Sequence, residues 1–137
     1  MQLIQWDEKL ATNIDLIDSQ HKEMFRIINI YFIKCQFNYI FEATYDCFKY
    51  LEQYALFHFQ TEEAYQREHH YPLANEHHAK HDILKIKIMH LSAKLDVNNF
   101  DEKTKEEYLD FLNNHLYAHI INDDLLYSNF LMENNIN

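Results

Sequence analysis

The chain has 137 residues, a formal net charge of −10, one proline and no glycine. This length can bury one sizeable core, so we expect a single domain over residues 1–137. The acidic balance argues against nucleic acid and anionic membranes as partners, because both need a basic surface. No apolar stretch is long enough to span a bilayer and the opening residues do not resemble a signal peptide, so a cytoplasmic location is expected.

Apolar residues recur at helical spacing through most of the chain, and the scarcity of glycine and proline disfavours turn-rich β architectures. Breaks in this pattern fall at Asn38, at residues 69–72 and at residues 96–101. Asparagine is the residue best suited to a left-handed helix stop when glycine is absent. Four helices with short connections predict an all-α, up-down-up-down four-helix bundle. The mostly apolar residues 125–132 predict a short C-terminal helical tail.

Polar residues of the kind that bind metals interrupt the apolar stripes of the first two predicted helices. The first helix, residues 17–36, places His21 on its apolar stripe. The second helix, residues 39–68, carries His58 and Glu62 four residues apart, so both side chains project from one face. Because buried polar groups are costly unless something satisfies them, these positions indicate a binding site.

The third and fourth predicted helices repeat this pattern. The third begins after Pro72 and sets His77 and His81 four residues apart, on successive turns that can reach a single ion. The fourth carries His115 and His119 at the same spacing. One such pair is typical of a surface histidine or of one satisfied in the core. Ligand-type residues on all four helices, near one level of the bundle, predict a buried metal site.

The residue types narrow the choice of metal without deciding it. Imidazole with carboxylate suits iron, zinc or copper, and the chain has no thiolate set that would select structural zinc. Five histidines and two carboxylates are too many for one tetrahedral zinc and suit two octahedral ions bridged by the carboxylates. Regular helix geometry places Asp123 about 40° from His119 and Asp124 about 140° from it, which favours Asp123 as the second carboxylate.

These motifs, in this order and spacing, resemble the hemerythrin family in its single-domain bacterial form. The resemblance covers nearly the whole chain and rests on Trp6 with the runs IDSQH at 17–21, HFQTEE at 58–63, YPLANEHHAKH at 71–81 and HIINDDLLY at 119–127. It implies reversible dioxygen binding at a non-haem di-iron centre inside the four-helix bundle.

The resemblance also implies a ligand set: His77, His81 and His119 on one iron, His21 and His58 on the other, and Glu62 and Asp124 as bridges beside an oxo or hydroxo group. The family spacing selects an acid five residues after His119 with a tyrosine three residues later, and Asp124 and Tyr127 satisfy both conditions. This choice requires the fourth helix to end or distort between Ile120 and Asp123. Asp123 then becomes a cap or a solvated acid.

Four apolar residues are expected, by their positions relative to the ligands, to line an oxygen pocket: Met24, Phe59, Leu116 and Ile120. His115 stands beside this pocket where the family commonly has tryptophan. It is expected to donate a hydrogen bond to bound peroxide, to add a proton and hasten autoxidation, or to bond a backbone carbonyl or water. Asn13 replaces a family glycine and is able to adopt the left-handed conformation. The remaining histidines are expected at the surface, namely His69, His70, His78 and His90. Tyr71 is expected as a hydrogen-bond partner of the site or as part of a helix entry.

The expected function is that of a dioxygen carrier, store or sensor rather than an enzyme. The alternatives are a di-iron enzyme that consumes peroxide or nitric oxide, and an iron store. Dioxygen is the expected partner, and a redox or oxygen-using enzyme is the class of protein that such a carrier would serve. Because no exposed apolar stripe is obvious in the sequence, a monomer is expected.

Overall fold

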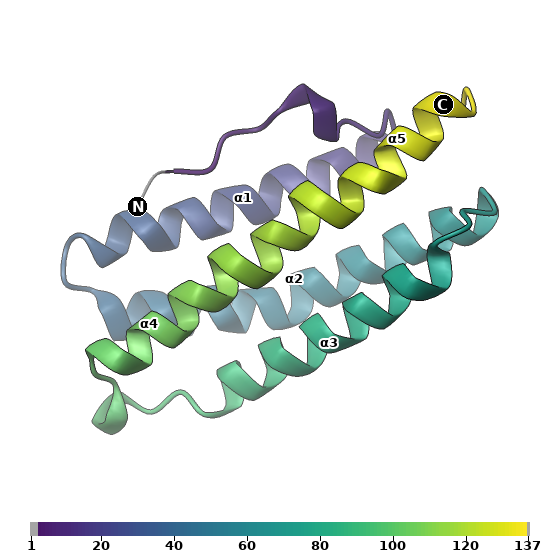
Figure 1. Cartoon of the computed structure of the whole chain (residues 1–137). Coiled ribbons are helices and arrows are strands. Elements are labelled where there is room, and N and C mark those ends of the chain that lie inside the picture. Colours follow the sequence, from purple (N-terminus) through teal and green to yellow (C-terminus); the bar gives the residue numbers. More distant parts are fainter. Residues whose placement is uncertain (1–2, 137) are drawn as a thin grey trace.

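The structure is a computed structural model and describes residues 3–136. Three long helices, α1 (Asp15–Cys35), α2 (Ile40–Glu68) and α3 (Ala74–Ala93), run alternately up and down beside a fourth helical rod (Figure 1). This arrangement confirms the predicted four-helix bundle. None of the helices in the described part of the chain is long and apolar enough to cross a membrane.

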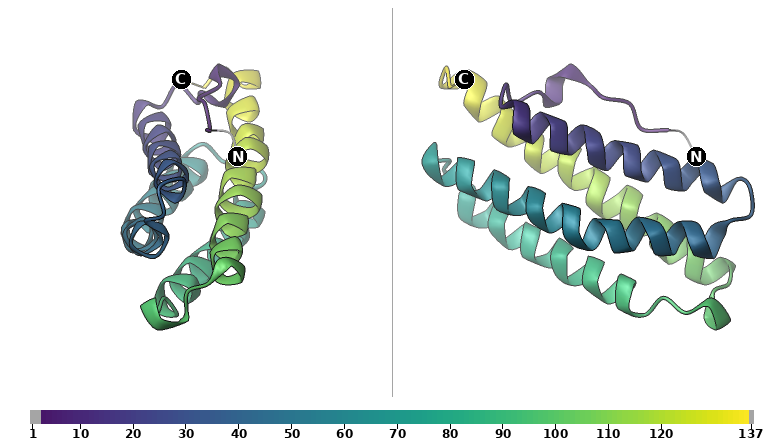
Figure 2. Two further views of the ribbon diagram at one scale, coloured as in Figure 1. Left: turned by 90° about the vertical axis from the view of Figure 1, so that its left-hand side faces the viewer. Right: turned by 180° about the vertical axis from the view of Figure 1, so that it is seen from behind.

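The fourth rod consists of four consecutive helical segments on one axis (Figure 2). It begins with α4 (Glu102–Asp110) and continues through the π-helical segment η3 (Phe111–Tyr117). A second π-helical segment, η4 (Ile120–Asp124), leads directly into α5 (Leu125–Glu133). The predicted C-terminal helical tail is therefore α5, and it extends the fourth rod rather than folding away from it.

Residues with left-handed backbone conformation mark the ends of the first two long helices. Asn38 has φ 66° between α1 and α2, and His70 has φ 55° between α2 and α3. Asn13, ahead of α1, has φ 62°. Asparagine tolerates this region better than other non-glycine residues, so the predicted helix stop at Asn38 and the predicted left-handed conformation of Asn13 are both confirmed.

Two single-turn 3-10 helices lie in the remaining connections, η1 (Glu8–Leu10) and η2 (Val97–Asn99). The N-terminal segment is tied to α5, because the Ser128 hydroxyl donates a hydrogen bond to the Ala11 carbonyl at 2.7 Å. Asp101 caps the start of α4, where its carboxylate accepts a hydrogen bond from the Thr104 amide at 2.8 Å.

The interior of the bundle differs between its two ends. The beginnings of α1 and α3 share one end of the bundle with the end of α2 and with η4 and α5 (Figure 1). The opposite end holds an apolar core in which the Phe48 ring meets Tyr108 edge to face at 4.9 Å. The predicted metal-binding residues fall at the first of these ends, because each lies near the matching end of its own helix.

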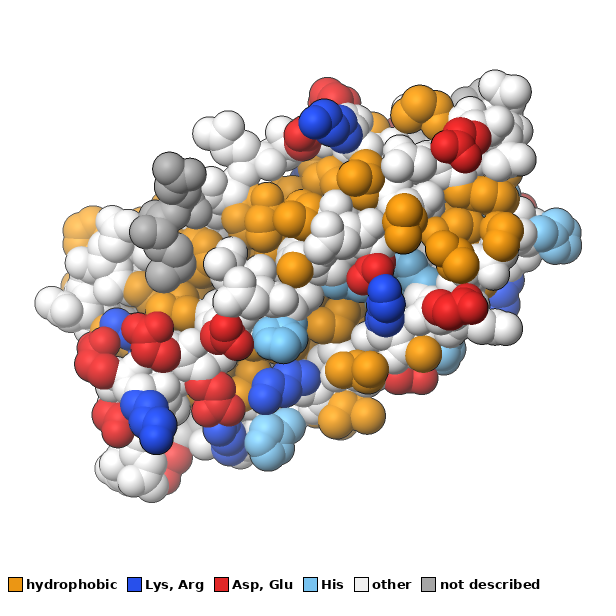
Figure 3. All heavy atoms as spheres, in the orientation of Figure 1, with side chains coloured by type: hydrophobic (Ala, Val, Ile, Leu, Met, Phe, Trp, Pro, Cys, Tyr) orange, Lys and Arg blue, Asp and Glu red, His pale blue; other side chains and the backbone are white. Residues whose placement is uncertain are grey.

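The α3 helix carries apolar side chains on its outer face as well as its inner one. Ile83 and Ile86 are each 68% exposed and Met89 is 55% exposed. Figure 3 shows apolar patches on the face of the molecule where this helix lies. The expectation that no apolar stripe is exposed is therefore wrong, since sequence periodicity does not separate two apolar faces of one helix.

Candidate metal centre

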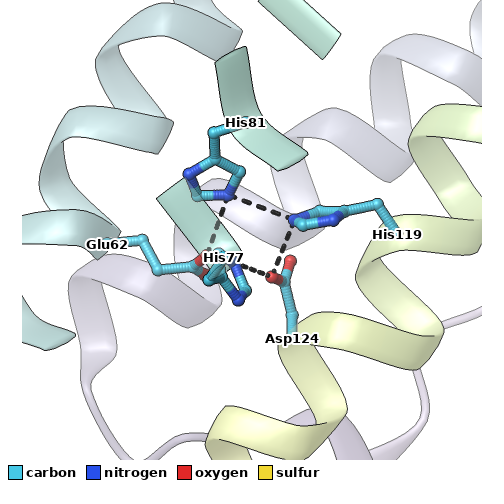
Figure 4. A group of neighbouring side chains, drawn as sticks. All are labelled: Glu62, His77, His81, His119 and Asp124. Carbon is cyan, nitrogen blue, oxygen red and sulfur yellow. Dashed lines mark hydrogen bonds and ion pairs between the residues drawn. The ribbon is translucent and has the colours of Figure 1, made fainter. Parts of the chain in front are cut away.

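All seven residues expected as metal ligands lie in the interior, at most 5% exposed: His21, His58, Glu62, His77, His81, His119 and Asp124. They form two groups, and within each group the ligand atoms lie within 4.8 Å of one another. The larger group consists of Glu62, His77, His81, His119 and Asp124. The smaller group consists of His21, His58, Glu62 and Asp124. Figure 4 shows the larger group converging from α2, α3 and the fourth rod. The two carboxylates belong to both groups, and we call them the shared carboxylates.

The two oxygens of Glu62 face different histidines. Oε1 lies 2.7 Å from His77 Nε2 and 3.3 Å from His81 Nε2. Oε2 lies 3.3 Å from His21 Nε2 and 3.6 Å from His58 Nε2. One carboxylate thus reaches two separate groups of imidazoles, as a ligand that bridges two cations would.

Asp124 divides its oxygens in the same way. Oδ1 lies 2.9 Å from His77 Nε2 and 3.1 Å from His119 Nε2. Oδ2 lies 2.9 Å from His21 Nε2. The shared carboxylates therefore stand between a group of three imidazoles and a group of two.

Several of these close contacts are not aligned as hydrogen bonds. Among the described residues, buried atoms without an aligned partner include both ring nitrogens of His21, Nε2 of His58, Oε2 of Glu62 and both oxygens of Asp124. Most of these atoms lie within ion-pair distance of a partner, but they make no aligned hydrogen bonds. Because orphaned buried polar atoms are costly, two metal ions fit this arrangement better than a network of hydrogen bonds.

The π-helical segment η4 explains how Asp124 reaches the centre. In a π-helix the hydrogen bonds run between residues five apart, so residues at that spacing lie on one face. His119 immediately precedes η4 and Asp124 ends it. The fourth rod thus distorts at the expected place without ending.

Asp123 is not the cap or solvated acid that the sequence suggested. Its carboxylate accepts a hydrogen bond from His119 Nδ1 at 3.0 Å and one from Lys80 Nζ at 2.6 Å. These bonds, with that of His119 foremost, lower the pKa of Asp123 to about 2. Side chains four residues apart meet on a helix, so the spacing correctly predicted that Asp123 contacts His119. The contact is with Nδ1, on the side of the ring that faces away from the centre.

Two further residues bond the outer nitrogens of ligand-type histidines. Gln20 Oε1 accepts a hydrogen bond from His58 Nδ1 at 2.8 Å, and Glu63 Oε2 accepts one from His81 Nδ1 at 2.8 Å. Each bond directs the other nitrogen of the ring, Nε2, toward the centre. Sequence reasoning missed Gln20 and Glu63, and their only signal was adjacency in sequence to a candidate ligand.

Before a metal binds, the shared carboxylates govern the protonation of the imidazoles. Burial opposes the charged form of His21 and His77, yet the carboxylates raise the pKa of each to about 10. Burial also opposes the charged form of His119, but Asp124 and Asp123 raise its pKa to about 9. His58 differs, because burial and the nearby His21 lower its pKa to about 3. Metal binding therefore has to displace protons from three of the rings.

The four apolar residues expected around bound oxygen are all buried, at 0% to 1% exposure: Met24, Phe59, Leu116 and Ile120. Three of these four adjoin an expected ligand along the helix, because Met24 lies one turn after His21 while Phe59 and Ile120 directly follow histidines. The Phe59 ring also stacks on the His81 imidazole, with centroids 4.2 Å apart.

His115 does not lie beside this apolar interior, contrary to expectation. Its side chain is 53% exposed, stacks on Phe111 at 5.9 Å and faces Asp110 at 3.4 Å. The inward position at this level belongs to Leu116, the next residue, so His115 points to one side of the rod. It lines a surface hollow of about 240 Å³, together with Lys80 and the outer side of His119.

The remaining histidines are only partly as expected. His70 and His90 are exposed, whereas His78 is about half exposed and lies 2.6 Å from Glu63. His69 is half-buried, and its Nδ1 lies 2.8 Å from the hydroxyl of the buried Tyr127. A turn residue was expected in solvent, but this bond ties the end of α2 to α5.

Tyr71 is buried against Tyr127, with ring centroids 5.0 Å apart. Burial, with the nearby acids Asp123 and Asp124, raises the pKa of its hydroxyl to about 12. The ring therefore packs at the end of the bundle near the shared carboxylates, as a helix-entry residue that covers this end.

A four-helix bundle whose interior holds two groups of imidazoles around two carboxylates defines a class of metal-binding proteins. The family model for the hemerythrin HHE cation binding domain matches residues 12–130. The bacteriohemerythrin of Clostridium acetobutylicum is 29% identical over 126 residues, which cover 89% of this chain and 96% of that protein. The chain belongs to the hemerythrin family, and the resemblance read from its motifs is confirmed.

Proposed function

We propose that this protein binds dioxygen reversibly at a pair of iron ions held by the seven buried residues. The proposal rests on the arrangement of the five imidazoles, which form one group of three and one group of two. The shared carboxylates lie close to both groups. His77, His81 and His119 with the shared carboxylates offer five ligand atoms to one ion. His21 and His58 with the same carboxylates offer four to the other, which leaves it room for a small exogenous ligand.

When bound, the iron pair supplies the two electrons that reversible oxygen binding requires. The chain supplies the surroundings. Met24, Phe59, Leu116 and Ile120 are fully buried and carry no ionisable group, which suits an interior that excludes water and dissolved reductants. The shared carboxylates offset part of the positive charge of two cations, which favours their burial.

Lodging the seven ligands on four separate helices fixes the geometry of the centre. His58 and Glu62 project from successive turns of α2, and His77 and His81 do so on α3. The hydrogen bonds that His58, His81 and His119 donate to Gln20, Glu63 and Asp123 hold the three rings in orientation, so oxygen can bind and leave without rearrangement of the ligands.

An optical titration tests the proposal. Metal-free protein is loaded with ferrous iron without air, and its spectrum is recorded before and after oxygen is admitted and again under vacuum. We expect a visible absorption band that appears with oxygen and disappears under vacuum, with two iron ions per chain. A zinc-loaded sample is the matched control and should show no band.

Other outcomes of the same titration would overturn the proposal. Steady consumption of peroxide or nitric oxide by the iron-loaded chain, without a reversible band, would support the enzyme alternative. Iron uptake far above two ions per chain would support storage. A stable band that vacuum does not remove would show irreversible oxidation rather than carriage.

A further inference from the structure

The residues behind the imidazoles differ in charge between the two groups. In the group of three, His81 Nδ1 bonds Glu63 at 2.8 Å and His119 Nδ1 bonds Asp123 at 3.0 Å. Both partners are carboxylates. In the group of two, His58 Nδ1 bonds the neutral amide oxygen of Gln20 at 2.8 Å.

The other imidazole of the smaller group has no partner behind it at all. Among the described residues, nothing bonds His21 Nδ1, which is a buried atom. Two negative charges thus support the rings of one group, and none supports the rings of the other.

These outer carboxylates themselves contact basic side chains at the surface. Glu63 is 6% exposed and lies 2.6 Å from His78 and 3.6 Å from Arg67, whose side chain is 66% exposed. Asp123 is 19% exposed and lies 2.6 Å from Lys80, whose side chain is 54% exposed. Solvent screens the exposed cations more strongly than the sheltered carboxylates, so a net negative field remains at the group of three.

A carboxylate behind a ligand histidine increases the basicity of the nitrogen that faces the metal. An amide fixes the orientation of the ring but adds no charge. We propose that Glu63 and Asp123 make the two metal positions unequal in affinity, so that the position of His77, His81 and His119 fills first and releases its ion last. This inference rests on the ligand set of the proposed function, but not on oxygen binding.

The inequality has a consequence for the protein when metal is scarce. The position of His21 and His58, which has room for oxygen, is the one that empties first. A chain that retains one ion then keeps it at the five-ligand position. Partial loss of metal therefore abolishes oxygen binding while the fold keeps its larger group of ligands satisfied.

Cobalt(II) serves as the probe, because it prefers the same nitrogen and oxygen donors and resists oxidation in air better than ferrous iron does. Metal-free protein is titrated in competition with a chelator, which yields two dissociation constants. Crystals grown with one cobalt per chain locate the ion by anomalous scattering. We expect unequal constants and the single cobalt between His77, His81 and His119.

Two matched variants test the cause. Glu63→Gln keeps an oxygen that accepts the bond of His81 but removes the charge, and it should weaken the tighter constant by about 10- to 100-fold, the effect typical of residues behind a ligand. Gln20→Glu adds the charge behind His58 and should tighten the weaker constant by about 10-fold. Circular dichroism and uptake of two ions at excess cobalt verify that each variant is folded.

A single cobalt shared equally, or placed at His21 and His58, would overturn the inference. Unchanged constants in both variants would overturn it as well. Uptake of only one ion at excess cobalt would overturn the ligand set and this inference with it. Two unequal positions in a chain whose iron form fails to bind oxygen would contradict the proposed function alone and leave the inference standing.

Discussion

Asp123 and Asp124 stand next to each other in the chain, and their carboxylates meet different partners. Asp124 faces imidazoles of both groups, whereas Asp123 lies behind His119 and bonds Lys80. Asp124→Ala should lose metal from both positions, because it removes an oxygen that faces each. Asp123→Ala should still take up two ions at excess metal, with affinity lowered by about 10- to 100-fold.

Metal content after gel filtration, measured at stoichiometric and at excess metal, separates these two variants. Asp46→Ala, which removes an exposed acid of α2, is a matched control for the loss of an acid and should keep both ions. Loss of the metal pair in Asp123→Ala together with its retention in Asp124→Ala would refute the assignment.

Removing one partner of the hydrogen bond between Tyr127 and His69 is predicted to cost more stability than removing the other. Tyr127 is 0% exposed, whereas His69 is half-buried and can turn to solvent. Tyr127→Phe should therefore cost about 1 kcal/mol of unfolding free energy, and His69→Ala, which strands a buried hydroxyl, about 1–3 kcal/mol. Urea unfolding of the metal-loaded variants measures both costs. A larger cost for Tyr127→Phe would contradict this account.

At the scale of the elements, the turn between α1 and α2 depends on the left-handed conformation of Asn38. Asn38→Ala should lower the unfolding free energy by about 1 kcal/mol, because alanine lacks the short polar side chain whose local hydrogen bonding lets asparagine adopt positive φ. Asn38→Gly should be close to neutral, since glycine adopts this region freely but costs more entropy when ordered. Thermal unfolding midpoints measure both. Equal destabilisation by the two substitutions would show that side-chain contacts rather than φ decide.

Helix position and direction were predictable because the apolar period of 3.6 residues marks the buried face. Histidines such as His58 and His81 stood out as polar interruptions of that face, and their helices delivered them inward. The same periodicity did not decide whether His115, four residues before His119, also points into the core. Near the border of a buried face, a rotation of one residue decides whether a side chain enters the core.

The type of helix was less predictable than its position. No local pattern in residues 120–124 distinguishes a π-helix from an α-helix, and regular geometry selected Asp123. Only the family spacing indicated a distortion. Gln20 and Glu63 were missed for a related reason, because a residue behind a ligand is defined by tertiary contact and leaves no periodic signal.

At the scale of the whole molecule, the bundle has one apolar half and one polar half. The apolar half packs residues such as Phe48, Leu51 and Tyr108 and does not depend on metal. The polar half buries the shared carboxylates and five imidazoles, whose free energy depends on what binds them. Stability of the metal-free chain should therefore vary with the protonation of this half.

Raised pKa values set the direction of that variation. His21, His77 and His119 have pKa values of about 10, 10 and 9 against an ordinary value of 6.5. A raised pKa contributes stability that is complete below the unfolded value and is lost as pH rises through the folded one. Metal-free protein should thus lose stability between pH 7 and pH 10 (about the range of these pKa values).

Urea midpoints at pH 7, 8, 9 and 10, with and without metal, measure this effect. Metal replaces the protons on these rings, so the loaded protein should lose less stability over the same range. A metal-free protein that gained stability with rising pH would contradict the predicted role of the imidazoles.

The π-helical turn η4 also bears on how proteins of this kind are compared by sequence. It places Asp124 beside His119 although five positions separate them, within a rod whose axis stays straight. An alignment that treats this stretch as a regular helix assigns the ligand role to the acid four residues after the histidine and overlooks the acid five residues after it. A one-residue gap here would therefore mark the gain or loss of a shared carboxylate, and it deserves the weight usually given to a substituted ligand.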